Sequence, residues 1–358
     1  MNKKKLAILR NEVAEDHLDW VNACKEMSQI VDYQIIDITL EDWMEQITSQ
    51  SFDGLLALPS GWTTPFKTLY DERLYILHTI LGYPIFPSME EIQIYENKKY
   101  LSYWLKANKV PHPRTWVFYH EKEALQFLKT ATLPLVAKMS IGGGGNGVQI
   151  LKTRGAVRHY ILKTFSGHGT TQSVGPKWRN KGFFKRVIHK LRHLQELKNK
   201  FIQYQHLRSE VQKDFVLFQE FIPHTFEWRA VRIGDSFFAH KKLIKGEKAS
   251  GSLLKGYENP PLELMDFLKA VTDKRGFLSQ AVDMFEPEKG QYLVNEMQCI
   301  FGQSDPYQML VDGTPGRYRN IQGKWVFEPG DFNRNASFLL RLEYFLEILS
   351  KNESPVPA

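Results

Sequence analysis

Hydrophobic residues in the first ninety positions gather into short runs, and longer stretches of mixed polarity separate these runs. Runs of this length are typical of buried strands, and the mixed stretches between them are typical of helices. Alternating strands and helices predict a small parallel sheet covered by helices. No Gly-x-Gly-x-x-Gly sequence follows the first strand, so no dinucleotide site is predicted there. The strands are expected at 5–9, 33–38, 53–59 and 84–87, and the helices at 14–27, 39–50 and 70–81.

The centre of the chain continues this alternation around a cluster of glycines. A helix predicted over 90–109 has to end at Val110-Pro-His-Pro113, because proline cannot continue a helix. Further on, the apolar strand 135–139 runs into Gly142-Gly-Gly-Gly-Asn-Gly147, and a second strand follows at 148–151. This order differs from a Walker loop, which needs a Lys and a Ser or Thr at the start of a helix.

The second half of the chain mixes strands with three helical stretches. The first of these, rich in Lys and Arg, is predicted over 183–211. The other two helices are expected at 262–274 and 335–350, and the strands at 215–220, 227–233, 237–243, 279–285 and 292–297.

A chain of 358 residues exceeds what one hydrophobic core usually supports. We therefore expect an α/β (α+β) protein with three parts. The first part, 1–92, is the small parallel α/β domain. The second part, 93–220, carries the glycine loop and a basic helical insertion at about 156–213, and the third part is 221–358.

The composition places the chain among ordinary globular proteins. Hydrophobic residues make up 42% and charged residues 24%, which argues against wholesale disorder. No apolar run is long enough to cross a bilayer, and the apolar stretch 6–9 is too short for a signal peptide. The two cysteines, Cys24 and Cys299, give neither a disulfide framework nor metal-ligand spacing. The sequence therefore predicts a cytoplasmic protein.

The basic character of the chain is concentrated in one segment. The net charge is +7, yet Lys152–Lys213 alone holds fifteen Lys and Arg against two Glu. Such a segment favours an anionic partner, such as an acidic glycan, a lipid-linked phosphate or a membrane surface. Nucleic acid is less favoured, because no base-reading pattern is present. A solvated helical hairpin that covers a neighbouring site explains the charge equally well.

Five motifs that could bind a nucleotide occur in a fixed order. Their order resembles that of the ATP-grasp enzymes, especially the ribosomal-protein glutamate ligases and the D-alanine–D-alanine ligases, over about 97–305. The resemblance implies the ATP-grasp fold, preceded at 1–92 by the small α/β domain that this family also carries. The motifs are Asn97-Lys98-Lys99, Lys138 with the glycine cluster, Val216–Ile222 with Glu227, Arg229 with Lys241-Lys242 to Lys255-Gly256, and Asp283 with Glu296 and Gln298.

The first two motifs suit phosphate. Lys98 opens a helix, where a lysine adds its charge to free backbone N–H groups. Lys138 interrupts an apolar strand and needs an anionic partner, because burying an unpaired charge is costly. Glycines let backbone N–H groups turn toward an anion. The resemblance implies that Lys98, Lys138 and the glycine loop bind the phosphates of ATP; a solvated lysine and an ordinary hairpin are the alternatives. The loop residues concerned are Gly142, Gly143, Gly144, Gly145 and Gly147.

The third motif resembles the strand that holds adenine. By this resemblance, the main-chain groups around Glu220 and Phe221 read the adenine edge. Glu227, seven residues further on, takes the place of the family's acidic ribose ligand. Without the other motifs, a core strand followed by a surface Glu explains the same residues.

The fourth motif supplies cations where the family places a loop for the transferred phosphate and the carboxylate substrate. Positive groups that face developing phosphoryl charge are what such a reaction needs. Arg229 and Lys242 are the candidates for this catalytic role. Five lysines lie between 241 and 255, so the sequence leaves the choice among them open.

The fifth motif resembles a Mg²⁺ site. In the family, an Asp and a Glu on adjacent antiparallel strands share the metal, and an Asn follows two residues after the Glu. Asp283 and Glu296 match, and Gln298 stands where Asn is expected. The period of two in a strand places Glu296 and Gln298 on one face, and oxygen ligands suit Mg²⁺. Two unrelated carboxylates are the alternative.

Together the motifs predict an ATP- and Mg²⁺-dependent carboxylate–amine ligase. In such an enzyme ATP phosphorylates a carboxylate, and an amine attacks the acyl phosphate to give an amide, ADP and phosphate. Two alternatives stay open: a kinase of the same fold that phosphorylates a hydroxyl, and a non-catalytic protein that binds ATP and a polyanion. The stretch 301–334 departs from the small-residue turn expected after the metal strand and is expected to shape the substrate pocket.

Overall fold

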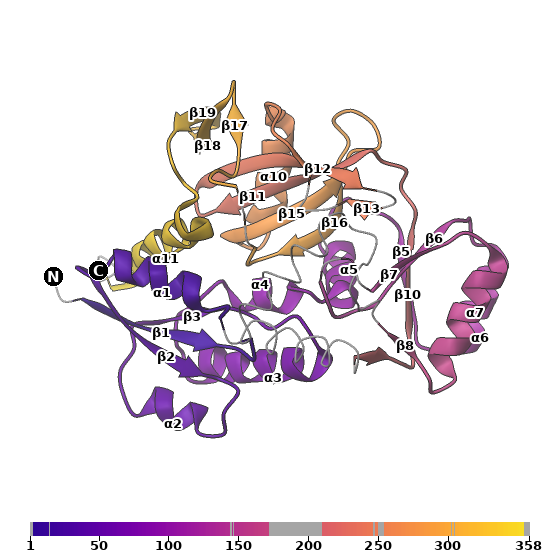
Figure 1. The fold of residues 1–358 in the computed structure, drawn as a ribbon, viewed down its shortest axis with the longest axis horizontal. Coiled ribbons are helices and arrows are strands. Elements are labelled where there is room, and N and C mark those ends of the chain that lie inside the picture. Colours follow the sequence, from indigo (N-terminus) through magenta and orange to yellow (C-terminus); the bar gives the residue numbers. More distant parts are fainter. Residues whose placement is uncertain are drawn as a thin grey trace, which may run out of the picture.

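The N-terminal part of the chain forms a parallel four-stranded sheet in the order β2-β1-β3-β4 (Figure 1). This confirms the parallel sheet that the sequence predicts. The computed structural model describes residues 3–13, 15–143, 145, 147–171, 210–245, 248–249, 254–301, 303 and 305–353. The strands are β1 (Lys4–Arg10), β2 (Val31–Asp37), β3 (Gly54–Ala57) and β4 (Ile85–Phe86); the helices are α1 (Leu18–Glu26), α2 (Trp43–Thr48), α3 (Thr64–Tyr75) and the π-helix η1 (Ile76–Ile80).

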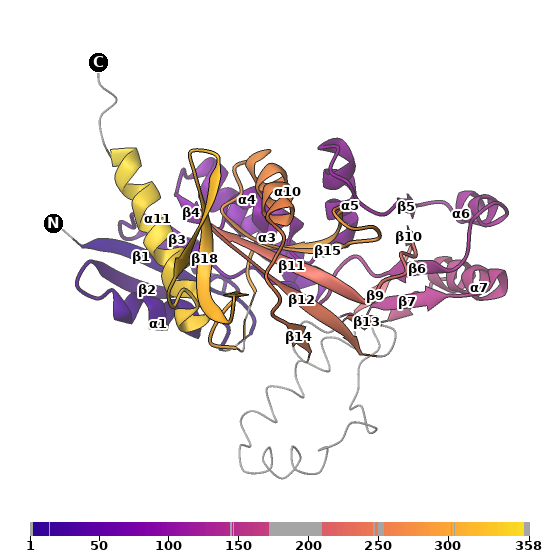
Figure 2. The ribbon, with the colours of Figure 1, turned by 90° about the horizontal axis from the view of Figure 1, so that it is seen from above.

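The C-terminal helix α11 (Phe338–Glu353) packs beside α1, so both ends of the described chain share one core (Figures 1 and 2). Phe338 lies edge-on against Trp20, with ring centroids 4.7 Å apart. Phe345 lies so close to Gly54 that a Cβ there would meet its ring at 2.6 Å. The helix starts at 338 and not at the predicted 335, because Asn335 adopts φ 50° and leaves the right-handed helical region.

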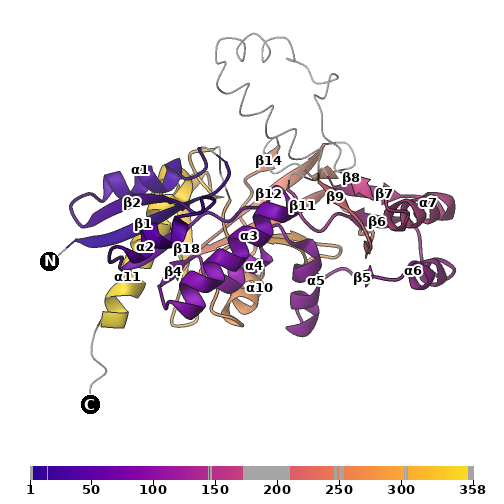
Figure 3. The same ribbon diagram turned by 90° about the horizontal axis from the view of Figure 1, so that it is seen from below.

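A second four-stranded sheet, in the order β5-β10-β6-β7, is antiparallel. Two helices cover it at the end of the molecule far from both termini (Figures 1 and 3). Of these helices, α7 follows directly after the second glycine-loop strand and overlaps the start of the predicted basic helical insertion (about 156–213), for which the sequence analysis specifies a helix only at 183–211. The elements are β5 (Thr115–Phe118), α6 (Glu121–Leu128), β6 (Leu135–Lys138), β7 (Val148–Leu151), α7 (Arg154–Phe165) and β10 (Val216–Glu220).

The third and largest sheet is antiparallel and holds nine strands around the path β16-β15-β11-β12-β18-β17. Helix α10 packs on one face of it (Figure 2). The stretch 301–334, for which no elements are predicted, adds three of its strands. The elements are β11 (Phe226–Ile233), β12 (Ser236–Lys245), β13 (Lys248–Ala249), β14 (Lys255–Gly256), α10 (Leu262–Asp273), β15 (Ser279–Phe285), β16 (Leu293–Gln298), β17 (Leu310–Val311), β18 (Thr314–Ile321), β19 (Lys324–Pro329) and the short η2 (Arg334–Ser337).

The helix predicted over 90–109 is two helices, α4 (Met89–Ile94) and α5 (Lys98–Ala107). Between them Glu96 has φ 50°, which ends the first helix. Asn97 then starts the second, because its side-chain oxygen accepts a hydrogen bond from the N–H of Tyr100 at 3.2 Å. The break turns Glu96 and Lys98 toward the large sheet.

Most of the basic helical insertion, 172–209, lies outside the described residues, and so does the greater part of the helix predicted over 183–211. At its end, Val211 belongs to β9 (Val211–Gln212), which pairs with β8 (Thr170–Thr171), and is therefore strand and not helix. No helix in the described residues has the length and apolar character needed to cross a membrane.

Glu91 joins the N-terminal part of the chain to the large sheet. This carboxylate is buried, and its Oε1 accepts the N–H groups of Leu278 at 3.0 Å and Ser279 at 2.8 Å. Its Oε2 accepts the N–H of Ser88 and closes a capping box on α4. One side chain therefore satisfies three backbone donors on two different parts of the fold.

We predict that Glu91→Ala lowers the free energy of unfolding by about 2–4 kcal/mol, because it leaves these buried N–H groups without partners. Urea unfolding followed by circular dichroism measures the change. Glu123→Ala, on an exposed position of α6, is the control and should cost about 0.5 kcal/mol or less. Equal free energies of unfolding for Glu91→Ala and Glu123→Ala would contradict the role of Glu91 in holding the N-terminal part against the large sheet.

Candidate functional site

A row of charged and polar side chains crosses one face of the large sheet. Directly opposite residues of antiparallel strands share a face, and the register pairs His240 with Arg229, Arg229 with Asp283, and Asp283 with Glu296. Lys242 and Glu227 form the next pair on that face. The folded sheet thus gathers residues of the third, fourth and fifth sequence motifs onto one surface.

Asp283 is the centre of this row. Its Oδ1 accepts the Nε–H of Arg229 at 2.8 Å, and its Oδ2 accepts hydrogen bonds from Arg229 Nη2 at 2.9 Å and Lys242 Nζ at 2.6 Å. The carboxylate is 2% exposed. Burial opposes its ionisation, but the two cations outweigh burial and hold the pKa of Asp283 well below its usual range.

Glu227 extends the network toward the second sheet. Its Oε2 accepts a hydrogen bond from Lys242 at 2.8 Å, and its Oε1 accepts one from Asn295 Nδ2 at 3.3 Å. The Oδ1 of the same Asn295 accepts a hydrogen bond from Lys138 at 2.9 Å. Lys138 comes from β6, so this chain of contacts links the glycine-loop sheet to the large sheet.

Lys98 approaches the row from the start of α5. Its Nζ donates to the carbonyl of Gly142 and to Glu96 Oε2 at 3.4 Å, and it lies 3.6 Å from Glu296 Oε1. The side-chain amide of Gln298 donates to Glu96 Oε1 at 3.0 Å. The structure therefore brings Lys98 to the carboxylates of the large sheet and to the first glycine of the loop.

The pKa values of Lys138 and Lys98 are shifted in opposite directions. Burial lowers the pKa of Lys138 to about 8, with Lys98 acting in the same direction and Glu296 against it. Burial would also lower the pKa of Lys98, but Glu96 and Glu296 outweigh it and raise that pKa. Lys138 makes one amide contact and no carboxylate contact within the described residues, which leaves it the cation most in need of an anion.

The glycine loop begins at this point of the site. Gly142 has φ 117°, a conformation that side chains rarely adopt. A Cβ at Gly143 would lie 2.7 Å from Glu96 Oε1, and one at Gly147 would lie 2.8 Å from Met139 Cβ, so both positions need glycine for close approach. Gly145 has φ 69°. Gly144 and Asn146 lie outside the described residues.

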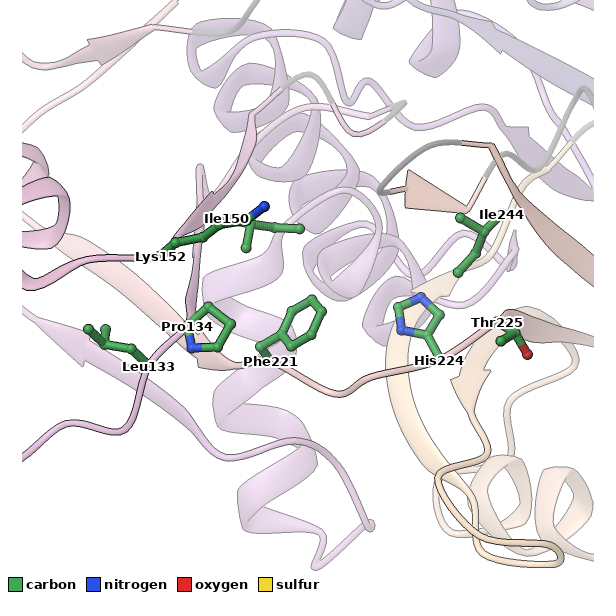
Figure 4. A pocket seen from close by; sticks show the side chains of 8 residues that line it. All are labelled: Leu133, Pro134, Ile150, Lys152, Phe221, His224, Thr225 and Ile244. Carbon is green, nitrogen blue, oxygen red and sulfur yellow. The ribbon is translucent and has the colours of Figure 1, made fainter.

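A cavity of about 650 Å³ lies beside the charged row, between the second sheet and the large sheet (Figure 4). The side chain of Phe221, one of the two residues whose main-chain groups are expected to read adenine, lines this cavity. The neighbouring Glu220 is paired with Arg114 outside the cavity, and its N–H donates to the carbonyl of Arg114 at 2.9 Å. The lining residues are Leu133, Pro134, Ile150, Lys152, Phe221, His224, Thr225 and Ile244.

The structure distinguishes among the five lysines between 241 and 255, from which the sequence could not select one. Lys242 lies in the charged row. Lys241 pairs with the exposed Glu258, and Lys255 pairs with Gln303 and with Asp305, at 3.1 Å from the latter. Lys245 and Lys248 belong to strands β12 and β13. Lys242 is the lysine of this group that contacts Asp283 and Glu227 in the described structure.

The predicted metal ligands lie on adjacent strands, and their oxygen donors suit Mg²⁺. Asp283 and Glu296 are directly opposite, and Gln298 turns its oxygen toward Arg229 at 3.5 Å. Both oxygens of Asp283 are engaged by Arg229 and Lys242, and the described residues hold no group of three or more His, Cys, Asp or Glu placed to bind a metal. The donor chemistry fits Mg²⁺, but a cation at Asp283 requires Lys242 to turn to another anion.

Four residues of this site are missing from the sequence-based set: Glu96, Asn295, His224 and His240. Glu96 and Asn295 each adjoin a predicted residue, but nothing in the sequence distinguishes them from surface polar groups. Their roles depend on the break between α4 and α5 and on a register irregularity in β15–β16 beside Asp283. A search for polar residues next to each motif would have included both.

Comparison with known proteins identifies the fold. No protein-family model and no curated protein sequence matches this chain. The chain is similar in structure to a RimK domain ATP-grasp protein from Sphaerobacter thermophilus (TM-score 0.51, 14% identity, 82% of this chain and 90% of that one). It is also similar to D-alanyl-alanine synthetase A from Vibrio cholerae (TM-score 0.56, 11% identity, 98% and 100%).

A third similar structure is the biotin carboxylase domain of 2-oxoglutarate carboxylase from Hydrogenobacter thermophilus, in complex with MgADP, ADP and bicarbonate. Its TM-score is 0.54 at 14% identity, over 86% of this chain and 66% of that one. At these identities the likeness concerns the fold. The chain has the ATP-grasp fold, as its five motifs predict.

We predict that Asp283→Asn lowers the free energy of unfolding by about 3 kcal/mol, because it leaves Arg229 and Lys242 buried without their shared counter-charge. Thermal and urea unfolding measure the effect. Asp266→Asn, on the exposed side of α10, is the matched control and should stay within about 0.5 kcal/mol of the parent protein. A loss below about 1 kcal/mol at Asp283 would contradict its central place in the network.

His240 gives a prediction on pH. Burial, with the nearby Arg229, lowers the pKa of His240 to about 3, and its Nδ1 lies 2.9 Å from the carbonyl of Gln308. The unfolded state, with an ordinary histidine pKa near 6.5, therefore binds the proton more tightly than the folded state. His240 contributes its full stability above about pH 6.5 and loses it as the pH falls from about 6.5 toward 3.

We predict that His240→Asn, whose amide can replace the Nδ1 donor, reduces the loss of stability between pH 7 and pH 5 by about 2 kcal/mol. Urea unfolding at the two pH values gives this difference directly. His78→Asn removes an exposed histidine that has a similar carbonyl contact and serves as the control. An unchanged pH dependence in His240→Asn would show that His240 does not couple folding to proton uptake.

Proposed function

We propose that this chain, which has the ATP-grasp fold, is an ATP- and Mg²⁺-dependent carboxylate–amine ligase. The observation that supports this most is that Lys98 and Lys138 converge with Arg229 and Lys242 of the charged row beside an apolar cavity. An apolar cavity suits a purine base, and convergent cations beside it suit a polyphosphate. The similar structures include ligases and a complex with MgADP, which agrees with this reading.

The charge balance supports a need for a divalent cation. Lys98, Lys138, Arg229 and Lys242 give the site four basic residues, and Glu96, Glu227, Asp283 and Glu296 balance them with four carboxylates. A neutral site cannot compensate a triphosphate by itself, so the nucleotide must bring added positive charge. Asp283 and Glu296, with Gln298, are the residues that would hold Mg²⁺. When bound, the metal would neutralise the charge that develops on the transferred phosphoryl group.

The side chains of this protein then have distinct tasks. Lys138, on the second sheet, and Lys98, at the start of α5, hold the phosphates from the side of the glycine loop. Lys242 leaves Asp283 and binds the transferred phosphoryl group. Arg229, bound to Asp283 through two hydrogen bonds, keeps its position and orients the carboxylate substrate.

Two steps complete the proposed reaction. A carboxylate oxygen of the substrate forms a bond to the γ-phosphorus, and the bond from this phosphorus to the β,γ-bridging oxygen breaks, which releases ADP. The amine nitrogen then attacks the acyl carbon, phosphate leaves, and the amine gives up a proton to form the amide. Neither step requires a protein nucleophile.

The alternative reaction, phosphorylation of a hydroxyl, needs a base that removes the hydroxyl proton. The carboxylates of the charged row are all engaged with Arg or Lys in the described structure, so none is poised for that task. The ligase reaction therefore remains the proposal. The reaction product, an amide or a phosphorylated hydroxyl compound, distinguishes the ligase from the kinase. We further propose that the enzyme is cytoplasmic and that the basic segment Lys152–Lys213 binds an anionic partner.

We predict Mg²⁺-dependent release of ADP when the purified protein is incubated with ATP and pooled carboxylates and amines. Glu296→Ala should reduce the rate by about 100-fold or more, because it removes a proposed metal ligand from the transition state. Mass spectrometry of the same mixture should show a new amide. Glu288→Ala, an exposed carboxylate outside the row, should keep the parent rate.

The products decide among the remaining possibilities. ADP together with a phosphorylated hydroxyl compound, and no amide, would replace the ligase by a kinase. Failure of the parent protein to bind any adenine nucleotide in the presence of Mg²⁺ would refute the proposed function altogether.

A further inference from the structure

The segment Glu210–Gln212, which we call the strap, lies where three parts of the molecule meet. Glu210 and Gln212 are both buried, at 7% and 6% exposure. Glu210 contacts the start of α3 in the N-terminal part, and Gln212 contacts residues beside the glycine loop and beside β10. Figure 1 shows β8, the strand that pairs with the strap, between α3 and the second sheet. The strap therefore connects the N-terminal part to the sheet that carries the glycine loop.

Gln212 holds a residue that lies two positions before the glycine loop. Its Oε1 accepts a hydrogen bond at 2.7 Å from the N–H of Ser140, which is 72 residues away in the chain. Its Nε2 donates to the carbonyl of Phe215 at 3.3 Å. A carbonyl can only accept a hydrogen bond, so this contact fixes the amide with its oxygen toward Ser140. Both polar groups of the Gln212 side chain are thus engaged.

Ser140 is also held by the start of α5. Its carbonyl accepts the N–H of Lys98 at 2.9 Å, and its hydroxyl donates to Asn97 Oδ1 at 3.1 Å. The same Asn97 oxygen caps α5. Lys98 in turn donates through its Nζ to the carbonyl of Gly142. A displacement of Ser140 would therefore shift the proposed phosphate-binding lysine and the first glycine of the loop relative to each other.

The glycine loop needs anchors outside itself. Glycine has more conformational freedom than any other residue, so backbone N–H groups in such a loop stay directed at an anion only if its ends are fixed. At the far end, the N–H of Met139 donates to the carbonyl of Gly147 at 2.9 Å. At the near end stands Ser140, which is 4% exposed. Without Gln212 its buried N–H would lose its partner, and the backbone would have to move to find another.

The strap is itself anchored to α3. Glu210 Oε2 accepts the N–H of Thr64 at 2.9 Å, and Glu210 Oε1 accepts the Thr64 hydroxyl at 2.5 Å. The side chain of Thr63, directly before this helix, makes no capping hydrogen bond, so Glu210 supplies the cap from a distant part of the chain. Just before β8, a Cβ at Gly169 would lie 2.7 Å from the carbonyl oxygen of Gln212. The strap is therefore packed closely on this side as well.

We propose that Glu210 and Gln212 are positioning residues, which hold the start of the glycine loop where its N–H groups and Lys98 meet the outer phosphates of ATP. The inference rests on the proposed function, and it adds a link between the N-terminal part and the phosphate site. Neither residue lines the apolar cavity, so binding of the base does not depend on them. Their loss should weaken the contribution of the outer phosphates to nucleotide affinity and leave that of the base.

The test is isothermal titration of the full-length protein, in the presence of Mg²⁺, with AMP and with the β,γ-imido analogue of ATP. The ratio of the two dissociation constants measures what the outer phosphates contribute. Gln212→Met keeps the length of the side chain and removes both hydrogen-bonding groups. We expect this ratio to fall about five- to tenfold in Gln212→Met, the range that one hydrogen bond supplies, while the dissociation constant for AMP changes by less than about twofold.

A matched control and a double variant separate positioning from a general loss of structure. Gln280 is also buried, and its side-chain atoms make no hydrogen bond within the described residues. Strand alternation places it on the face of β15 opposite to Asp283, so Gln280→Met should keep the ratio within about twofold. Glu210→Ala should lower the ratio about threefold. Combined with Gln212→Met it should lower the ratio no further, because both residues act through Ser140.

The outcomes distinguish this inference from the function on which it rests. If the parent protein favours the imido analogue but Gln212→Met keeps the ratio, the strap does not position the loop and the ligase proposal stands. The same holds if Gln280→Met lowers the ratio as much, or if the effects of Glu210→Ala and Gln212→Met add. If the parent protein binds neither nucleotide, the proposed function fails as well. Circular dichroism at the titration temperature checks that each variant is folded, and Glu210→Ala tests the strap should Gln212→Met not fold.

Discussion

The pairing of Asp283 with Arg229 and Lys242 is the interaction on which the rest of the site depends. Three charges lie within hydrogen-bonding distance in a place that water barely reaches. Burying any one of them alone would be strongly unfavourable, so each fixes the position of the others. Because Arg229 uses both carboxylate oxygens, it is held rigidly, whereas Lys242 divides its contacts between Asp283 and Glu227. The lysine is thus the member of the group that can turn toward a ligand at the lowest cost.

The site depends equally on the meeting of separate parts of the chain. Lys138 comes from the second sheet, Lys98 from α5, and the carboxylates from the large sheet. Asn295 joins Lys138 to Glu227, and Glu91 fixes the N-terminal part against β15. A shift of one sheet against another would change several of these distances together. The apolar cavity lies along the same boundary, which is where ligand sites commonly form.

Beyond the row, the structure builds a second polar group around Asp305. Asp305 is held by Lys255 and Tyr257, and its carbonyl accepts a hydrogen bond from Asn333 at 2.7 Å. Lys255 pairs with Lys242 across β14 and β12, so this group adjoins the row. Its residues come from the stretch 301–334, from β14 and from Tyr257 directly after β14.

The sequence by itself determined the parallel N-terminal sheet and the order of the motifs, because period, turn residues and spacing are local properties. Only the resemblance to a known family implied that Lys98, Lys138, Asp283 and Glu296 belong to one site. Only the tertiary structure decided the rest. Which of five lysines joins Asp283 depends on the pairing of β12 with β11, and Glu96 enters the site only because two helices break where one continuous helix is predicted. Likewise, α11 completes the N-terminal core from the far end of the chain. These features rest on contacts between residues distant in sequence, and no local pattern encodes such contacts.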